Sequence, residues 1–152
     1  MSTEFHLAQF NIARALGTMD EPVMREFAEN LERINGLADA NPEFVWRLQS
    51  EQGDATDILA YEDESLLVNM SVWQSLDALR DYVYASEHLD FLKKKKHWFE
   101  KVEGPSLVLW WIPAGTLPCI EDGKQALEHL RVHGSSPRGF TFANPEPKPT
   151  AD

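Results

Sequence analysis

The chain has 152 residues, of which 43% are hydrophobic and 11% aromatic, and it carries a formal net charge of −11. This length and composition predict a globular protein with one core, and they exclude a disordered or fibrous protein. Phosphate backbones and anionic membranes repel an acidic surface, so we expect neither a nucleic acid nor a membrane as a partner.

A single cysteine, Cys119, excludes an intramolecular disulfide bond and a thiolate metal cluster. The chain has no uninterrupted run of about 18 apolar residues and does not start with a basic region followed by an apolar one. We therefore expect a cytoplasmic protein.

Alternation and helical spacing of apolar residues predict the elements of the first half. They are a strand over 5–12, a helix from 20 or 21 to about 40, a short strand over 44–49, a brief extended piece over 58–61 and a strand over 66–73. Asn41-Pro42 ends the helix, because the residue before a proline disfavours helical geometry.

The second half continues with helices and one strongly apolar strand. We expect helices over 75–85 and 86–102, a strand over 107–113 and a helix over 121–133. Ser75 is a suitable N-cap for the first of these helices. Gly134 is suitably placed to end the last helix. Prolines after residue 134 predict an irregular C-terminal tail.

This order of elements predicts an α+β protein with a ferredoxin-like split βαβ sheet. We assign residues 1–134 to one domain and residues 135–152 to the Pro-rich tail. We expect the helices to cover one face of the sheet. A second copy of the chain would then cover the other face and form a dimeric α/β barrel, which makes a homodimer the expected assembly.

The predicted strand over 66–73 is apolar on one side and polar on the other. We expect Phe10, Val68, Met70 and Val72 to face the helices. The opposite set would line the barrel side as a binding site for a small hydrophobic or aromatic molecule. This set comprises Gln9, Asn11, Arg47, Asn69, Ser71, Trp73 and Trp111. Alternatively, these groups bond one another, water or the second subunit.

Three of the five histidines bear on possible chemistry. His88 lies near the apolar stripe of its predicted helix, where a neutral imidazole can act as a general base or an axial haem ligand. The alternative is that His88 only caps local structure. His129 and His133 have the spacing of a metal-binding pair, but no third ligand follows with suitable spacing, and we predict no metal site.

Several segments together resemble a known family: HLAQFNIARAL at the start, FVWRLQ at 44–49, LVNMSVWQSLDALRDYVY at 67–84, the segment from His88 to Phe99, LWWIPAG at 109–115 and FTF at 140–142. They are similar to the domain of unknown function 3291 family. The resemblance implies a dimeric α/β barrel related in fold to the antibiotic-biosynthesis monooxygenases. It implies no established activity.

Three functions are consistent with these observations. The first is a homodimer that binds a small molecule between the sheet and its helices, with oxygenase-like or isomerase-like chemistry and no tightly bound cofactor. In that case His88 would accept a proton and Asn69 would polarise a carbonyl group or oxyanion. The second is a non-catalytic homodimer whose polar sheet face is the subunit interface. The third is a haem protein that uses His88.

Overall fold

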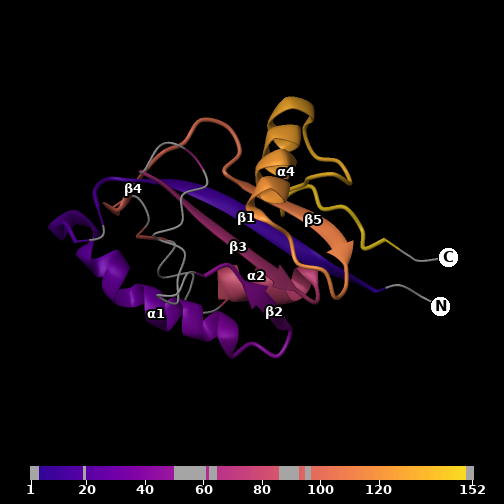
Figure 1. Cartoon of the computed structure of the whole chain (residues 1–152), viewed down its shortest axis with the longest axis horizontal. Coiled ribbons are helices and arrows are strands. Elements are labelled where there is room, and N and C mark those ends of the chain that lie inside the picture. Colours follow the sequence, from indigo (N-terminus) through magenta and orange to yellow (C-terminus); the bar gives the residue numbers. More distant parts are fainter. Residues whose placement is uncertain are drawn as a thin grey trace.

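A computed structural model of the chain describes residues 4–18, 20–49, 61, 65–85, 93–94 and 97–149. Its elements are, in order, β1 (Phe5–Ala15), the short 3-10 helix η1 (Pro22–Met24), α1 (Arg25–Asp39), β2 (Phe44–Arg47), β3 (Leu66–Trp73), α2 (Leu76–Ala85), β4 (Phe99–Glu100), β5 (Leu107–Pro113) and α4 (Ile120–His133) (Figure 1). The predicted α+β class is confirmed. The extended piece predicted over 58–61 lies almost wholly outside the described residues.

All strand pairs in the sheet are antiparallel, and β1 lies at its centre. One side of β1 pairs with β3, which in turn pairs with β2. The other side pairs with β5 along Phe5 to Asn11 and with β4 at Arg14 and Ala15. The order of the four longer strands is thus β2, β3, β1, β5, and the ferredoxin-like arrangement predicted from the sequence is confirmed.

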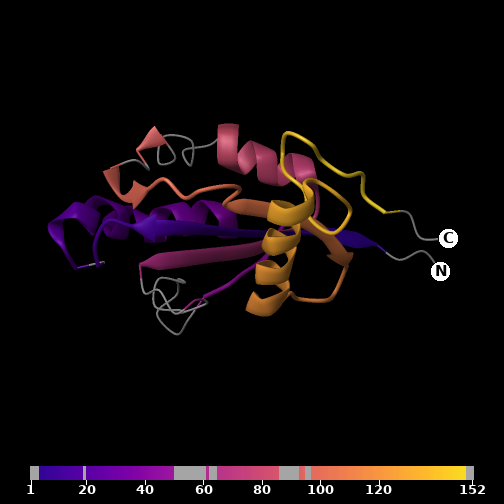
Figure 2. The same cartoon turned by 90° about the horizontal axis from the view of Figure 1, so that it is seen from above.

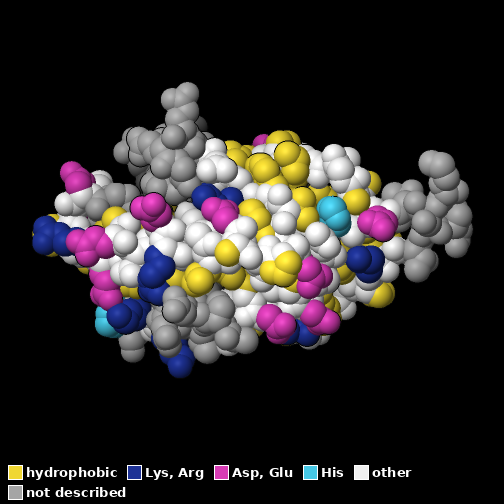
Figure 3. Space-filling view, turned by 90° about the horizontal axis from the view of Figure 1, so that it is seen from below, with side chains coloured by type: hydrophobic (Ala, Val, Ile, Leu, Met, Phe, Trp, Pro, Cys, Tyr) yellow, Lys and Arg dark blue, Asp and Glu magenta, His cyan; other side chains and the backbone are white. Residues whose placement is uncertain are grey.

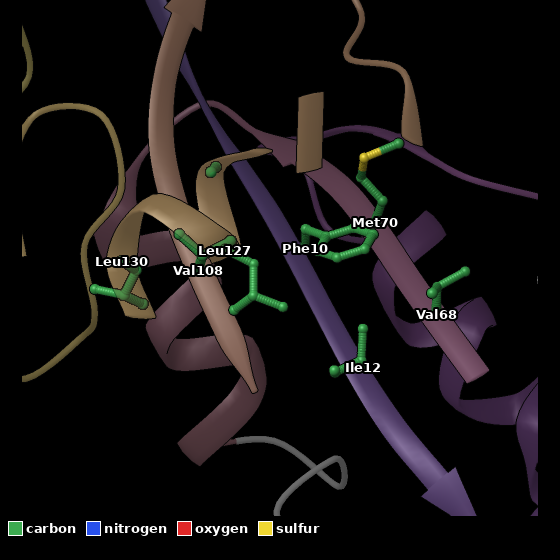
Figure 4. Packing of buried hydrophobic residues seen from close by; sticks show 8 residues of the cluster. Phe10, Ile12, Val68, Met70, Val108, Leu127 and Leu130 are labelled. Atoms are coloured by element: carbon green, nitrogen blue, oxygen red, sulfur yellow. The ribbon is translucent and has the colours of Figure 1, made fainter. Parts of the chain in front are cut away.

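Helices cover both faces of this sheet. α1 and α2 contribute to a core with Leu7, Trp73 and Leu109, whereas α4 contributes to a core with Phe10 and its neighbours. Figure 4 shows α4 on the near side of the strands, with the ribbons of α1 and α2 behind them. The expectation that helices lie on one face alone is wrong, because the C-terminal helix returns across the opposite face.

A glycine lets α4 come close to β1. A Cβ atom at Gly123 would lie 2.5 Å from the ring of Phe10, closer than any side chain tolerates. The helix crosses the strands (Figure 2). Ala126, Leu127 and Leu130 then pack on the face that carries Phe10. This contact gives the C-terminal helix a buried stripe, as expected of an amphipathic helix on a sheet.

Part of the same face carries a second, smaller cluster. Ala8, Val72 and Ile112 form a small buried cluster, and the partly buried rings of Trp46 and Trp110 pack against it. No residue of a described helix belongs to this cluster. Two tryptophans therefore form part of the outer surface of the sheet at this end.

The helix predicted over 86–102 does not extend to its expected end. Phe99 and Glu100 form β4 and pair with the end of β1, and Trp98 is buried in a cluster with Phe27 of α1. The ring centroids of Phe27 and Trp98 are 5.7 Å apart. Aromatic burial against α1 and pairing with β1 thus override the local preference for a helix. Most of the remaining predicted helix, including His88, lies outside the described residues.

The C-terminal tail is irregular, as predicted, and its described part packs onto the rest of the chain. Gly134 follows α4 with a φ of 77°, the left-handed geometry that suits glycine. Phe140 is fully buried, and its backbone N–H and C=O both bond to those of Leu109 at 2.8 Å. The tail thereby pairs with the outer edge of β5 over a single residue.

Candidate ligand site on the face beneath α1 and α2

The polar residues predicted to line a site share one face of the sheet. In the register of the strands Gln9 lies opposite Ser71, Asn11 lies opposite Asn69, and Leu7 lies opposite Trp73. Side chains that face each other across an antiparallel pair point to the same side. The alternation read from the sequence was therefore right in grouping these residues.

The side to which this face points differs from the prediction. From the alternation we expected the polar set to face away from the helices, toward a second subunit, although the first functional hypothesis placed the ligand between the sheet and its helices. The structure instead places it beneath α1 and α2, since Trp73 and Leu7 belong to the core that includes Ala38 of α1 and Leu79 of α2. Periodicity separates two faces but does not say which face a helix covers. The candidate site thus lies within one chain.

A chain of hydrogen bonds runs along this face. Trp73 Nε1 donates to Ser71 Oγ at 2.9 Å, and Ser71 Oγ donates to Gln9 Oε1 at 2.8 Å. Gln9 Nε2 then donates to Asn11 Oδ1 at 2.5 Å. Gln9 and Ser71 are buried, and they are the only buried polar residues in the described part of the chain.

The indole of Trp73 sets the direction of this chain of bonds. An indole N–H can only donate, so Ser71 accepts from it and must donate its own proton onward. Gln9 accepts with its oxygen and is left with its NH₂ group for Asn11. The amide of Asn11 consequently accepts with its oxygen and keeps its two N–H donors for another partner.

Asn69 lies beside the end of this chain of hydrogen bonds, and its side chain is exposed. Asn11, which lies opposite Asn69 on β1, is partly buried, and Ser71, the next residue on the same face of β3, is buried. Its side chain has no hydrogen-bond partner among the residues that the structure describes. Opposite residues in an antiparallel pair have Cβ atoms about 4.5–5.5 Å apart, so the amides of Asn69 and Asn11 can contact one ligand. The N–H donors of Asn11 and the amide of Asn69 therefore lie side by side where the face opens to solvent.

The other end of the site is closed by aromatic rings. The Tyr82 ring of α2 lies 5.0 Å from that of Trp73, and its hydroxyl donates to the carbonyl oxygen of Ile34 in α1 at 2.9 Å. Phe44 packs edge-on against the same indole at 5.3 Å. Tyr82 thus joins both helices to the tryptophan that starts the chain of bonds.

Arg47 lies on the same face but is held by an acidic residue. Its Nε is 2.9 Å and its Nη2 is 3.3 Å from the two carboxylate oxygens of Asp39, in a bidentate pair. Burial raises the pKa of the nearby Tyr82 hydroxyl above its ordinary value, while the charges of Arg47 and Asp39 act on it in opposite directions. The phenol is therefore kept neutral beside this ion pair.

Trp111 shares the face of Trp73 but has a different environment. Its indole Nε1 donates to the carbonyl oxygen of Glu146 in the tail at 3.0 Å. His88 lies outside the described residues, so its predicted role stays a prediction. Five residues of the predicted set, Gln9, Asn11, Asn69, Ser71 and Trp73, come together directly, and Arg47 lies at the edge of that group.

Sequence reasoning missed Tyr82 and Asp39. Tyr82 has a signal in the sequence, because it continues the stripe formed by Ala78 and Leu79 along α2. Asp39 is an acid in the last turn of α1, where the helix dipole disfavours a negative charge. An acid in that position indicates a basic partner, which is Arg47.

The pair His129 and His133 lies elsewhere, on the outer side of α4. Their ring centroids are 4.5 Å apart, in an open groove of about 480 Å³ that also contains Lys124 and Arg138. Burial, followed by the charges of Arg138 and His133, lowers the pKa of His129. Within the described residues no group of three or more His, Cys, Asp or Glu side chains is arranged to hold a metal ion.

The described helices contain no segment that is both long and apolar enough to cross a membrane. No curated protein is significantly similar to the chain. Among solved structures, the chain is similar to SnoaB, a cofactor-independent oxygenase from Streptomyces nogalater, with 15% sequence identity and a TM-score of 0.47 over 74% of this chain and 95% of that chain.

The chain is also similar to NE2512, a protein of unknown function from Nitrosomonas europaea, with 13% identity and a TM-score of 0.46 over 76% of this chain and 96% of that chain. At this level of similarity, the activity of SnoaB is a statement about SnoaB alone. The model of DUF3291, a domain of unknown function, matches residues 6–152, and the chain therefore belongs to the DUF3291 family.

Proposed function

We propose that this protein binds a small, partly aromatic molecule that carries a carbonyl or similar acceptor oxygen, on the sheet face beneath α1 and α2. The observation that carries the proposal is the directed chain of hydrogen bonds from Trp73 to Asn11. It leaves the N–H donors of Asn11 beside the exposed amide of Asn69. Donors fixed in this way favour an acceptor oxygen over a hydroxyl that must donate.

Ketone binding tests this proposal. Acetophenone and α-methylstyrene have nearly the same shape, but only the ketone has an acceptor oxygen. We expect acetophenone to bind more tightly, by about five- to tenfold for one hydrogen bond of about 1 kcal/mol. The measurement is the shift of the asparagine side-chain NH₂ resonances in an NMR titration of the full chain.

Two variants and one control locate the site. Asn11→Ala and Asn69→Ala are each expected to remove the preference for the ketone. Asn30→Ala is the matched control, because Asn30 bonds only within α1, to the carbonyl oxygen of Glu26 and to Arg33. Equal affinity for the two compounds, or no binding of either, would reject the proposal and favour a polar face that only stabilises the fold.

For catalysis we propose abstraction of a proton from a carbon next to the bound carbonyl group, the step that oxygenase-like and isomerase-like reactions share. His88 is the proposed proton acceptor, and Asn69 is the proposed donor to the developing oxyanion. Catalysed exchange of deuterium into the methyl group of acetophenone measures this step. His88→Ala should abolish the exchange and leave binding of the ketone unchanged, whereas retained exchange would remove His88 from the mechanism.

A further inference from the structure

The described tail, residues 135–149, crosses β5 and reaches α2, where it is held through its backbone. Trp111 Nε1 donates to the carbonyl oxygen of Glu146, and Arg80 Nη2 lies 3.5 Å from the carbonyl oxygen of Phe142. The Arg80 guanidinium also lies 5.9 Å above the Phe142 ring. Figure 2 shows the tail passing beside the end of α2. The two polar contacts recognise main-chain carbonyls, which any extended peptide offers.

One side chain of the tail adds selectivity for a cation. Lys148 Nζ lies 5.6 Å from the centroid of the Trp111 ring and donates to the carbonyl oxygen of Gln74 at 3.3 Å. An aromatic face and a carbonyl oxygen together favour an ammonium or guanidinium group. The net charge of −11 on the whole chain also favours a basic peptide over an acidic one.

Prolines fix the shape of the segment that carries this lysine. Pro145, Pro147 and Pro149 are all exposed, so their rings contribute little contact. Each proline fixes its own φ at about −65°, lacks an N–H group and drives the preceding residue toward extended geometry. The segment is therefore extended before it docks, and less conformational entropy is lost on binding.

The carboxylate of Glu146 takes no part in this docking. Only the backbone carbonyl of Glu146 bonds to Trp111, and its side chain has no hydrogen bond or ion pair within the described residues. The position of a negative charge beside Lys148 is thus not required by the surface. A peptide with a neutral residue at this position keeps every contact and avoids placing a negative charge next to the acidic protein.

We propose that Trp111 and the carbonyl oxygen of Gln74, here called the strap surface, form a recognition site for an extended peptide in which prolines flank a basic residue. The chain's own residues 144–149 are the resident occupant and compete with such a peptide. The inference does not depend on the proposed ligand site, because the strap surface lies at the closed end of the sheet face, away from Asn11 and Asn69.

Docking within the full chain is tested by hydrogen exchange of the Trp111 indole N–H, followed by NMR. Lys148→Ala, and separately the replacement of Pro145, Pro147 and Pro149 by Gly, should each speed this exchange. The expected factor is about fivefold for a loss of about 1 kcal/mol. Glu146→Gln is the matched control and should leave the exchange rate unchanged. An equal rate in all variants would overturn the proposal.

Binding of a separate peptide is tested with the full-length triple glycine variant. The probe is the capped peptide of residues 143–149 with Gln in place of Glu146. We expect it to shift the Trp111 indole resonance at about millimolar concentration, and to need about twice as much peptide with the wild-type chain, whose tethered tail competes at about millimolar effective concentration. If the triple variant does not fold, Lys148→Ala carries the same measurement.

Two further controls decide the outcome. Trp111→Phe in the glycine variant should weaken peptide binding about fivefold, and the same peptide with Ala in place of Lys148 should bind less tightly. A folded glycine variant that does not bind the peptide would overturn the proposal, as would equal binding of both peptides. If the mass of the wild-type protein increases with concentration and the glycine variant abolishes this increase, the tail binds the strap surface of a second copy. That result would contradict docking within the same chain.

Discussion

Ser71 shows how one hydroxyl group in a buried sheet both stabilises the core and orients the side chains of the proposed site. It accepts a hydrogen bond from Trp73, which is almost fully buried, and donates one to Gln9. A hydroxyl fits this position because it can do both at once. Loss of that hydroxyl would leave a donor and an acceptor unsatisfied in the core.

We therefore expect Ser71→Ala to lower the free energy of unfolding by about 1–3 kcal/mol, measured by urea denaturation. Asn69→Ala, two residues earlier on the same strand, is the control. Asn69 is exposed and has no partner among the described residues, so its replacement should change stability by no more than about 0.5 kcal/mol. Equal losses in the two variants would contradict the hydrogen-bond chain.

Tyr82 makes stability sensitive to alkaline pH. Burial raises the pKa of its hydroxyl in the folded protein, so above about pH 10 the unfolded chain loses this proton while the folded chain keeps it. Ionisation then favours unfolding, and stability is expected to fall by up to about 1.4 kcal/mol per pH unit for this one group.

Urea denaturation between pH 9 and 11 measures this effect. Tyr82→Phe should reduce the decline with pH, and it should cost about 1 kcal/mol at neutral pH because the bond to Ile34 is lost. Tyr84→Phe, in the same helix at a position 47% exposed, should keep the wild-type decline. Some decline remains in Tyr82→Phe, since burial also raises the pKa of Tyr61.

Among the elements, α4 depends most on the absence of a side chain. A Cβ atom at Gly123 would lie 2.5 Å from the Phe10 ring, whereas one at Gly36 in α1 would meet nothing within 4 Å. We expect Gly123→Ala to destabilise the protein by about 1–3 kcal/mol through overpacking. Gly36→Ala should stabilise it by up to about 1 kcal/mol through helix propensity.

Thermal unfolding followed by circular dichroism measures both changes. The two substitutions are chemically identical and both lie in helices, so opposite shifts of the melting temperature isolate the contact with β1. A stabilising Gly123→Ala would mean that α4 does not approach the sheet this closely.

The sequence predicted the positions of the helices and strands better than it predicted how they pack against one another. Alternation located the strand Leu66–Trp73 correctly, and Ser75 caps α2 as predicted, with its Oγ accepting from Ala78 N at 3.1 Å. These features depend on local geometry. Neither the return of α4 across the sheet nor the change from helix to strand at Phe99 follows from local signals, because both are decided by contacts with β1.

The candidate site was predicted in the same uneven way. Gln9, Asn11, Asn69, Ser71 and Trp73 were grouped by periodicity alone, and the register of β1 and β3 confirms that they share a face. The direction of the hydrogen bonds depends on which side chains meet across the strands. Tyr82 and Asp39 belong to helices whose position over the sheet has no local signal.

For the whole molecule, the homodimer remains a prediction. Figure 3 shows acidic and basic side chains interspersed with hydrophobic ones on one face of the molecule. The buried cluster of Ala8, Val72 and Ile112 contains no residue of a described helix, although Trp46 and Trp110, which cover it, also pack against the cluster that includes α4. Partly exposed aromatic rings over a buried cluster are typical of an interface core, so we expect a second copy to pack here.

Native mass spectrometry tests this assembly. We expect twice the mass of the 17.3 kDa chain, and Trp110→Glu should shift the population toward the monomer by placing a charge in the contact. Val132→Glu, on the exposed side of α4, is the control and should leave the mass unchanged. A wild-type monomer would leave the candidate ligand site intact, since α1 and α2 of the same chain cover it.

The bridge between Phe140 and Leu109 has a consequence for solubility. Backbone groups along an outer strand that lack partners act as a template on which strands of other molecules assemble. The pairing of Phe140 with Leu109 occupies one position of this edge of β5, and its ring is buried in the cluster that contains Leu7 and Leu109. We therefore expect loss of this residue to expose more of the edge of β5 to strand-by-strand aggregation, so that the tail around Phe140 helps to keep the protein from assembling into fibres.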